Sequence, residues 1–511
     1  MMNSMRLTVL AITFFLCSLA AMGQRSNVYD PLGQGAKCDG NTDDSAAFSK
    51  IQTLAGTAKA TITLPKARLC VLRDLTIASN ITLDFTAARG IKIMPGSTVT
   101  LGGPLVAKPV KIFYNALPTE GTVLFTGNAV PTFYSEWWGA LADESNDSTA
   151  AIVAAVTAIP TTGGRLMFQP SKTYRVSDRI ILKSNLTIEG HGATIDAGGI
   201  TSKTDTFLIQ GSNSSGQEAH DIVVDGLSMI NNPHQYQIQV FGWSFAYHPH
   251  NIRIHDLTTS GSSITGPLFV NIGSYIWFEN CVNVGGTQHI GVEAPVKNPG
   301  LTHHIWIKGN KTKATTQYGY QVVYGTDYVI ESNQVDGSAM TGGDRSGITV
   351  DRATKAIVRG NTIDNCPIAN IFITGSSDVS VTENTVSGGG SGINVSFNFE
   401  DKLDNTLNES SRINISNNIV KSFGAAYNGI IFNGVQDSSI TGNTVPSVAA
   451  PNIGIVIMDG QRPGDARTMH SKNIKFAENN VGGTVQFAVA NPVTVGRNQV
   501  GKYIGEYRQQ E

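Results

Sequence analysis

The feature that most constrains the fold is a short motif, Φ-x-x-N-x-Φ with Φ an apolar residue, which recurs through the second half of the chain. Three of its copies read VRGNTI, VTENTV and ISNNIV. The central slot is occupied in turn by Leu227, Leu257, Cys281, Asn310, Asn333, Asn361, Asn384, Asn418, Asn443, Asn479 and Asn498. Successive slots are 19 to 36 residues apart. A period of that length with variable inserts is typical of a solenoid, in which each repeat forms one coil.

Around each slot, apolar and polar residues alternate, which is the periodicity of a strand rather than of a helix. A second short strand begins with Gly about 14 residues before many slots, as in GYQVVY, GITVDR, GINVSF and GIIFNG. Each coil is therefore expected to hold a first strand, a bend, a second strand, the Asn turn and a third strand. Asn tolerates the left-handed turn conformation and can stack on the Asn of the next coil. The pattern predicts an all-β protein, a single-stranded parallel β-helix.

The N-terminal part contains a duplication in which Asp39 aligns with Asp143 and Asp43 with Asp147, both at an offset of 104 residues. Each copy is expected to pass from an acidic loop into a short helix, over 46–55 and 149–159, and then into strands. Asp and Ser at the start of each helix are expected to cap it. The alternative, that Asp39, Asp43 and Asp44 are catalytic or bind calcium, stays open.

The sequence as a whole predicts a signal peptide over residues 1–23, an N-terminal β-module with the first copy over 24–132, and a β-helix over 133–511. The second copy occupies 133–200 and the Asn-slot repeats occupy 220–500.

The N-terminus has the form of a secretory signal peptide. Arg6 is followed by the apolar stretch Leu7–Leu19 and by an Ala21-Met22-Gly23 cleavage site before Gln24. About 13 apolar residues are too few for a stable membrane span. A lipoprotein anchor at Cys17 is the alternative, although Leu16 is not the small residue that such a site needs. We expect a secreted or periplasmic protein with no membrane association after cleavage.

Four cysteines follow the signal peptide, too few for a disulfide scaffold. Cys38 and Cys70 lie in one module and can pair after export, whereas Cys281 occupies a slot and is expected to be buried. With Cys366, they form no CxxC pair or His/Cys cluster at metal-binding spacing, so we expect no metal site. The net charge is −2, from 37 Lys and Arg against 39 Asp and Glu. Such a balance argues against a nucleic-acid-binding protein.

The segment GAKCDGNTDDSAAF (35–48) resembles the opening of pectate-lyase-superfamily proteins related to glycoside hydrolase family 28. SEWWGALADESNDSTAA (135–151) is similar to the same segment in phage tailspikes, and SNLTIEGHGATIDAGG (184–199) to the family's first complete coil. The resemblance implies a right-handed parallel β-helix and a polysaccharide ligand. It also implies a monomer, or a homotrimer as in tailspikes.

The catalytic motifs of polygalacturonases do not carry over to this chain. The repeats contain no Asn-Thr-Asp or Asp-Asp, and Gly190-His191-Gly192 comes several coils too early. The Arg-x-Pro-x-x-Arg pattern of pectate lyases is absent as well. A polygalacturonase of the usual kind is therefore not expected.

Aligning the first strands by their distance to the slot predicts one outward-facing row of side chains. Its members are Asn271, Glu293, Val323, Asp351, Thr374, Ser396 and Asn433. Glu293 and Asp351 are then two coils apart, about 9–10 Å between backbones. Inverting glycosidases hold their two carboxyl groups roughly 6.5–9.5 Å apart. We therefore expect Glu293 and Asp351 to be catalytic, with Asp344 as a further candidate acid.

Other residues near this row are expected to bind substrate: His289, Tyr320, Tyr324, Arg345 and Arg352. The alternative is that Asp351-Arg352 and Asp344-Arg345 are exposed ion pairs on turns, which contribute little.

An aromatic insertion over 231–250 contains Trp243 and Tyr247. Aromatic rings provide flat surfaces for sugars, so we expect both to bind substrate. Packing of the insertion onto the barrel is the alternative.

Three functions fit these features. The first is a polysaccharide-cleaving glycoside hydrolase that needs no cofactor. The second is a lyase or epimerase on a uronic-acid polymer, with Arg345, Arg352, Lys297 or Tyr324 as the base and with calcium as a common helper. The third is a non-catalytic glycan-binding surface protein of tailspike type.

Overall fold

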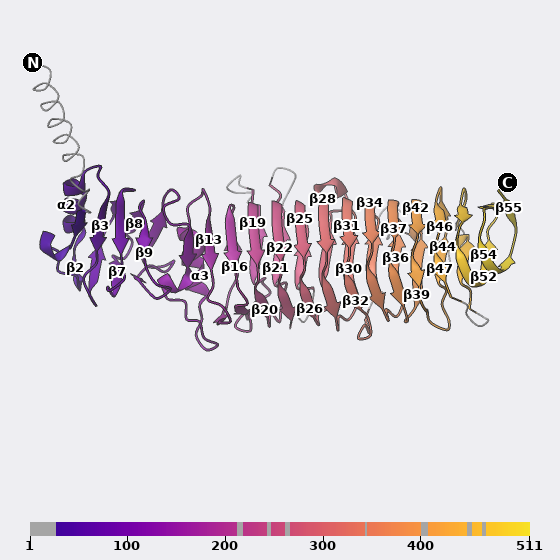
Figure 1. Ribbon diagram of the computed structural model, residues 1–511, viewed down its shortest axis with the longest axis horizontal. Helices are drawn as coiled ribbons and strands as arrows, with labels where there is room; N and C mark the ends of the chain where they lie inside the picture. Colours follow the sequence, from indigo (N-terminus) through magenta and orange to yellow (C-terminus); the bar gives the residue numbers. More distant parts are fainter. Residues whose placement is uncertain are drawn as a thin grey trace, which may run out of the picture. The chain divides into compact units, whose positions relative to one another are not determined.

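The computed structural model describes residues 27–211, 218–242, 247–260, 266–342, 345–399, 407–446, 452–461 and 467–510. The predicted signal peptide, including Cys17, lies outside these ranges. The chain divides into two compact units, Met1–Pro131 and Thr132–Glu511 (Figure 1). None of the helices in the described ranges is long and apolar enough to span a membrane.

The first unit is built from three small parallel sheets. The first consists of β1 (Asn27–Tyr29), β3 (Ala60–Thr63), β6 (Ile81–Asp84) and β9 (Leu105–Val106). The second consists of β2 (Asp39–Asp43), β4 (Leu69–Leu72), β7 (Gly90–Ile93) and β10 (Phe113–Tyr114). The third consists of β5 (Leu75–Ile77), β8 (Thr98–Leu101) and β11 (Thr122–Phe125). Neighbouring strands in each sheet pair in parallel, so this unit repeats the coil geometry on a smaller scale.

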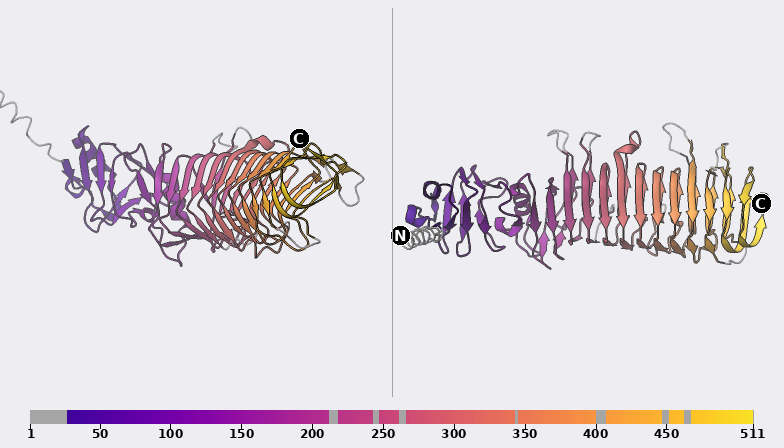
Figure 2. Two further views of the ribbon diagram at one scale, coloured as in Figure 1. Left: turned by 45° about the vertical axis from the view of Figure 1, so that its right-hand side comes forward. Right: turned by 45° about the horizontal axis from the view of Figure 1, so that its top comes forward.

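The second unit contains the Asn slots, and the second strands of its coils form one long parallel sheet. In order these are β12 (Thr132–Tyr134), β13 (Gly164–Met167), β16 (Leu186–Glu189), β19 (His220–Asp225), β22 (His250–His255), β25 (Gly273–Glu279), β28 (Thr302–Lys308), β31 (Thr326–Glu331), β34 (Thr354–Arg359), β37 (Ser377–Thr382), β42 (Ser410–Ser416), β46 (Ser439–Thr441), β51 (Lys475–Ala477), β53 (Val493–Val495) and β55 (Tyr507–Gln509). Figures 1 and 2 show the coils of this unit following one another in a single row.

The first and third strands of the coils share the other long sheet. The first strands are β15 (Ile180–Leu182), β18 (Phe207–Gln210), β21 (Ile238–Phe241), β24 (Leu268–Val270), β27 (Ile290–Glu293), β30 (Tyr318–Val323), β33 (Ser346–Asp351), β36 (Ala369–Thr374), β39 (Ser391–Ser396), β44 (Ile430–Asn433) and β48 (Ile455–Met458). The third strands are β14 (Thr173–Arg175), β17 (Thr194–Asp196), β20 (Ser228–Ile230), β23 (Thr258–Ser260), β26 (Val282–Val284), β29 (Lys311–Lys313), β32 (Gln334–Asp336), β35 (Thr362–Asp364), β38 (Thr385–Ser387), β43 (Ile419–Val420) and β47 (Thr444–Val445). The last coils end in β52 (Asn480–Ala488) and β54 (Gln499–Ile504).

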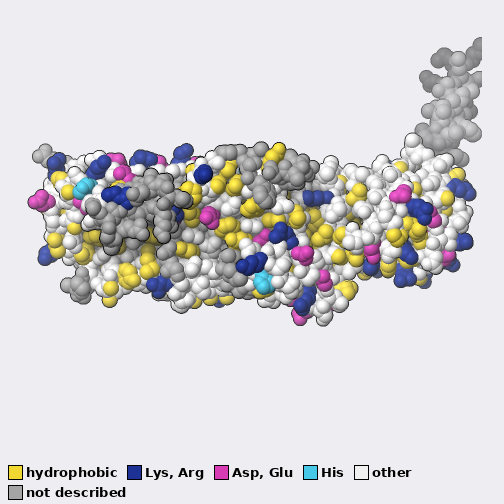
Figure 3. Space-filling model, turned by 180° about the vertical axis from the view of Figure 1, so that it is seen from behind, with side chains coloured by type: hydrophobic (Ala, Val, Ile, Leu, Met, Phe, Trp, Pro, Cys, Tyr) yellow, Lys and Arg dark blue, Asp and Glu magenta, His cyan; other side chains and the backbone are white. Residues whose placement is uncertain are grey.

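The fold is a right-handed parallel β-helix, as the repeats and the resemblance predicted. Inward residues of all three strands form one continuous apolar core, with Ile348, Val350 and Ile363 of a single coil fully buried. On the face drawn in Figure 3, charged side chains form small groups among larger areas of uncharged and apolar ones. That distribution agrees with a charged fraction of only 15 %.

The Asn slots form the predicted ladder. The Oδ1 atom of Asn361 accepts hydrogen bonds from the backbone N–H and the Nδ2 of Asn333 at 2.9 and 3.0 Å. Asn384 accepts the same pair of bonds from Asn361. The pattern continues from Asn310 to Asn498, the last slot. Cys281, in an earlier slot, is fully buried as predicted, and burial raises the pKa of its thiol to about 12.

The two predicted N-terminal helices are present as α2 (Ser45–Ala55) and α3 (Thr149–Ala158). The Oδ1 of Asp43 accepts the backbone N–H of Ser45 at 3.0 Å, and Asp147 does the same for Thr149 at 2.9 Å. These two carboxylates therefore cap the helix starts in both copies.

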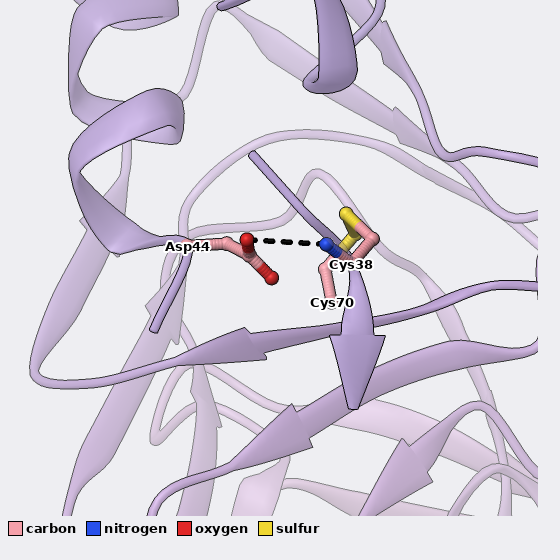
Figure 4. Close-up of side chains that lie close together, drawn as sticks. All are labelled: Cys38, Asp44 and Cys70. Atoms are coloured by element: carbon pink, nitrogen blue, oxygen red, sulfur yellow. Dashed lines mark hydrogen bonds between the residues drawn. A yellow bond between two sulfur atoms is a disulfide. The ribbon is translucent and has the colours of Figure 1, made fainter. Parts of the chain in front are cut away.

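The side chain of Ser148 does not cap its helix, because it bonds with the backbone of Leu141. Asp44 does not cap its helix either, which corrects the sequence interpretation for both residues. Its carboxylate is buried and accepts backbone N–H groups of Lys37, Cys38 and Val71. Figure 4 shows Asp44 beside the disulfide that joins Cys38 to Cys70. Because both sulfur atoms are used in this bond, the group is a structural crosslink and not a set of metal ligands.

Candidate functional site

The predicted outward row exists on the first-strand sheet. Glu293 of β27 pairs with Val323 of β30, and Val323 pairs with Asp351 of β33. The row continues in register through Thr374, Ser396 and Asn433. The register therefore agrees with the alignment made from the Asn slots alone.

Glu293 and Asp351 are two coils apart, with a spacing of about 9–10 Å between their backbones. Val323 lies between them with a short apolar side chain, and Glu293 is exposed. The two carboxylates thus face the same side across a gap that no charged side chain of the row fills.

Asp351 is held by two neighbours. Its carboxylate accepts Nε and Nη2 of Arg352 at 3.0 and 2.6 Å, and Nδ2 of Asn398 at 2.8 Å. The Asp351 side chain is only 14 % exposed, so this pair is unlike the exposed turn ion pair considered above. Asn398 comes from the hairpin of β40 (Asn398–Phe399) and β41 (Leu407–Asn408).

The bend after each first strand explains how these groups meet. Tyr324 and Arg352 follow the ends of β30 and β33, and both have positive φ, 57° and 50°. They therefore occupy equivalent places one coil apart, and the Arg352 guanidinium lies 4.4 Å from the centre of the Tyr324 ring. The next coil has Gly375 there, with φ of 55°; a Cβ atom would lie 2.9 Å from Cβ of Asn398 and 3.1 Å from Cγ of Arg352. Glycine thus leaves the space that Asn398 needs to reach Asp351.

The prediction that Tyr320 and His289 bind substrate is wrong. Tyr320 is fully buried because it pairs with the inward residues Ile290 and Ile348. His289 is also fully buried, with its ring 5.6 Å from that of Tyr320. Neither side chain can touch a polysaccharide on the outside of the helix.

His289 is expected to make the protein sensitive to acid. Neither ring nitrogen has a hydrogen-bond partner, and burial lowers the pKa of His289 to about 3. The unfolded chain binds this proton near pH 6.5, so the stabilising contribution is present above that pH. It is lost as the pH falls toward 3, by up to about 1.4 kcal/mol per pH unit. We expect His289→Phe to gain stability relative to the wild type between pH 6.5 and 4.5, measured by urea unfolding.

The matched control for this prediction is His191→Gln, because His191 is 48 % exposed in the same unit. Its unfolding free energy should follow the wild-type pH profile. Parallel profiles for the wild type and His289→Phe would contradict the prediction.

The remaining predicted residues are not gathered around Asp351. Arg345 precedes β33 and is half-buried, at the opposite end of that strand from Asp351. Lys297 is exposed in the bend after Glu293. Tyr247 is half-buried before β22, two coils before Glu293. Asp344 and Trp243 lie outside the described residues.

The second-strand sheet carries a polar and aromatic surface that the sequence interpretation missed. It contains six of the ten histidines, on or beside β19, β22 and β28, namely His220, His248, His250, His255, His303 and His304. The rings of Trp277 and Trp306 stack on neighbouring strands, 4.7 Å apart. Aligning the second strands by their distance to the slot, as was done for the first strands, would have found this surface.

One group on this sheet has ligand atoms close enough for a metal ion. The ligand atoms of Asp225, His255 and Asp256 all lie within 4.8 Å of one another. Nδ1 of His255 is 3.2 Å from the Asp225 carboxylate and 2.8 Å from that of Asp256. Asp225 and His255 each stand two residues before a slot, Leu227 and Leu257, so the same alignment of the second strands would have placed them on paired positions.

Comparisons with known proteins relate the chain to other β-helices. Residues 199–407, less than half of the chain, match the family described as periplasmic copper-binding protein (NosD). No curated protein sequence matches significantly.

Three solved structures illustrate the likeness. The surface protein and adhesin PfbA of Streptococcus pneumoniae has 14 % identity over 74 % of this chain and 99 % of its own, with a TM-score of 0.48. The tailspike of E. coli bacteriophage HK620, in complex with a pentasaccharide, has 12 % identity over 69 % and 75 %, with a TM-score of 0.47. The GH87 α-1,3-glucanase from Streptomyces thermodiastaticus has 14 % identity over 77 % and 70 %, also with a TM-score of 0.47.

Proposed function

We propose that this protein binds a polysaccharide along the outward side of its first-strand sheet and hydrolyses it with Glu293 and Asp351. The observation that carries the proposal is their register: Glu293, Val323 and Asp351 stand in one row on consecutive strands. A backbone spacing of about 9–10 Å lets the carboxyl groups approach to the roughly 6.5–9.5 Å of inverting glycosidases.

Asp351 is assigned as the base that activates water. Arg352 and Asn398 hold both of its oxygens, and a fixed orientation is what a water-activating carboxylate requires. Arg352 is itself fixed by stacking on Tyr324. Glu293 is assigned as the acid that protonates the leaving oxygen, because it is exposed on the same side and free to approach a bound glycosidic bond.

The disulfide between Cys38 and Cys70 supports a site of action outside the cytosol, since such bonds persist in oxidising compartments. We therefore propose that the protein is secreted or periplasmic, acts as a monomer or a homotrimer, and requires no cofactor.

The test is a screen of neutral and acidic polysaccharides in which the products are weighed by mass spectrometry. Hydrolysis adds one water to each pair of products. Glu293→Gln and Asp351→Asn are each expected to reduce the cleavage rate at least about 100-fold. Asp336→Asn is the matched control, because Asp336 is an exposed carboxylate on the third-strand side of a neighbouring coil. Full activity in both site variants would refute the assignment, and a new absorbance at about 235 nm would identify a lyase.

A second candidate function is glycan binding without cleavage. This function is favoured by the hydrogen bonds that Arg352 and Asn398 donate to the Asp351 carboxylate. A carboxylate fixed in this way could equally orient a bound glycan without reacting with it. If no polysaccharide is cut while affinity gels retard the wild type, this second function holds.

A further inference from the structure

A groove of about 500 Å³ lies on the second-strand sheet, on a different side of the helix from Glu293 and Asp351. It is lined by Asp221 and Val223 of β19, Asn251 and Arg253 of β22, and Trp277 of β25. These three strands are neighbours in the second-strand sheet and stand side by side in Figure 1.

The groove lies where a ladder of aromatic rings ends. Trp277 and Trp306 occupy paired positions, and their rings are 4.7 Å apart with planes only 3° from parallel. This spacing equals the distance between neighbouring strands, so each ring lies in the layer of its own coil. Trp306 covers one face of Trp277, and the opposite face is directed toward the preceding coil.

The next place in the ladder belongs to Arg253, which pairs with Trp277. Nε and Nη2 of Arg253 both lie 2.7 Å from Oε2 of Glu279, which stands two residues after Trp277 on the same strand. The guanidinium is therefore directed toward Glu279 and not over the Trp277 ring. One coil further, the paired residue is Val223, which is short. The interval from Val223 to Trp277 spans two coils, about 9–10 Å. It therefore offers room for a flat ring against the face of Trp277.

The polar groups of the groove suit an uncharged ligand. The positive charge of Arg253 is already paired with Glu279. The Asp221 carboxylate accepts Nδ2 of Asn251 and faces Nδ1 of His220 at 2.7 Å, which leaves lone pairs for further donors. Sugar hydroxyls are such donors, whereas a uronic-acid carboxylate would meet the negative charge of Asp221.

We propose that this groove is a binding site for an uncharged hexopyranose unit, whose ring stacks on Trp277 and continues the aromatic ladder by one place. Asp221 and Asn251 accept and donate hydrogen bonds to its hydroxyls. The site goes beyond the function proposed above, because it lies on another sheet and uses none of the same residues.

The experiment measures binding of maltotriose, cellotriose and tri-N-acetylchitotriose by saturation-transfer NMR, with trigalacturonate as the charged comparison. At least one neutral trisaccharide is expected to bind, and trigalacturonate at least about 10-fold more weakly. Trp277→Ala should weaken binding about 10-fold or more. Trp306→Ala is the matched control: it removes the same side chain from the next place in the ladder and should change the affinity less than about 3-fold.

A second variant keeps the test valid if Trp277→Ala fails to fold. Arg253→Trp puts a third stacked ring at the position that pairs with Trp277, so it should block the groove and abolish binding while thermal stability is retained. Glu293→Gln should leave binding at this site unchanged, which separates its outcome from that of the cleavage assay. The proposal is overturned if no neutral trisaccharide binds, or if binding survives both Trp277→Ala and Arg253→Trp.

Discussion

Replacing Asn361 by alanine is expected to lower the free energy of unfolding of the β-helix unit by about 3–5 kcal/mol. The Nδ2 of Asn361 donates to the carbonyl oxygen of Ile330, and its Oδ1 accepts both the backbone N–H and the Nδ2 of Asn333. The substitution removes these three hydrogen bonds, and of the two donors of Asn333 only Nδ2 keeps another acceptor, the carbonyl oxygen of Ile307. Asn333 and Asn361 are each only 1 % exposed, so water cannot replace the lost bonds. Each unpaired buried polar group costs about 1–3 kcal/mol, of which relaxation recovers a part.

The control for the ladder is Asn498→Ala. Asn498 is the last slot and is half-buried, so water can replace the bonds that are lost. We expect a loss of about 1 kcal/mol or less there. Urea unfolding followed by circular dichroism measures both variants. Equal losses at the two slots would show that position within the ladder does not determine the cost.

The ladder also explains why the fold and the row of the candidate site could be predicted from the sequence. From Asn310 on, an Asn in each coil marks the same position of the coil, and alternation along the strands then decides which side chains face outward. Because the coil geometry repeats, one alignment was sufficient to place Glu293, Val323 and Asp351 on paired positions. The same alignment placed Ile348 and Val350 inward, where they are fully buried.

Tyr320 pairs with the inward Ile348, so alternation already indicated its burial, against the role assigned to it. In the other cases, the deciding contact comes from a residue distant in sequence. His289 precedes its strand, and its burial depends on the following coil, where Tyr320 packs against it. Asn398 reaches Asp351 across 47 residues, from a hairpin that no local pattern indicates. Asp44 has the local context of a helix cap, yet it bonds to the backbone of Val71, 27 residues later. Local periodicity carries no information about such contacts.

The second large effect is expected in the first unit, where replacing Cys38 and Cys70 by serine should lower stability by about 3–4 kcal/mol. The disulfide closes a loop of 32 residues, and its loss restores conformational freedom to the unfolded chain. For a unit of this size the loss corresponds to a fall in Tm of more than about 10 °C.

Differential scanning calorimetry with and without reductant tests this expectation on the wild type directly. The reductant should move the transition of the first unit downward and leave that of the second unit in place, because Cys281 and Cys366 are buried free thiols. Cys281→Ala is the matched control: it removes a cysteine without a crosslink, so it should leave the response to reductant unchanged. The double serine variant, in turn, should show no response at all. A transition of the first unit that does not move on reduction would mean that the non-covalent contacts around Asp44 are sufficient, since its buried carboxylate already joins the backbone at Cys38 to that at Val71, next to Cys70.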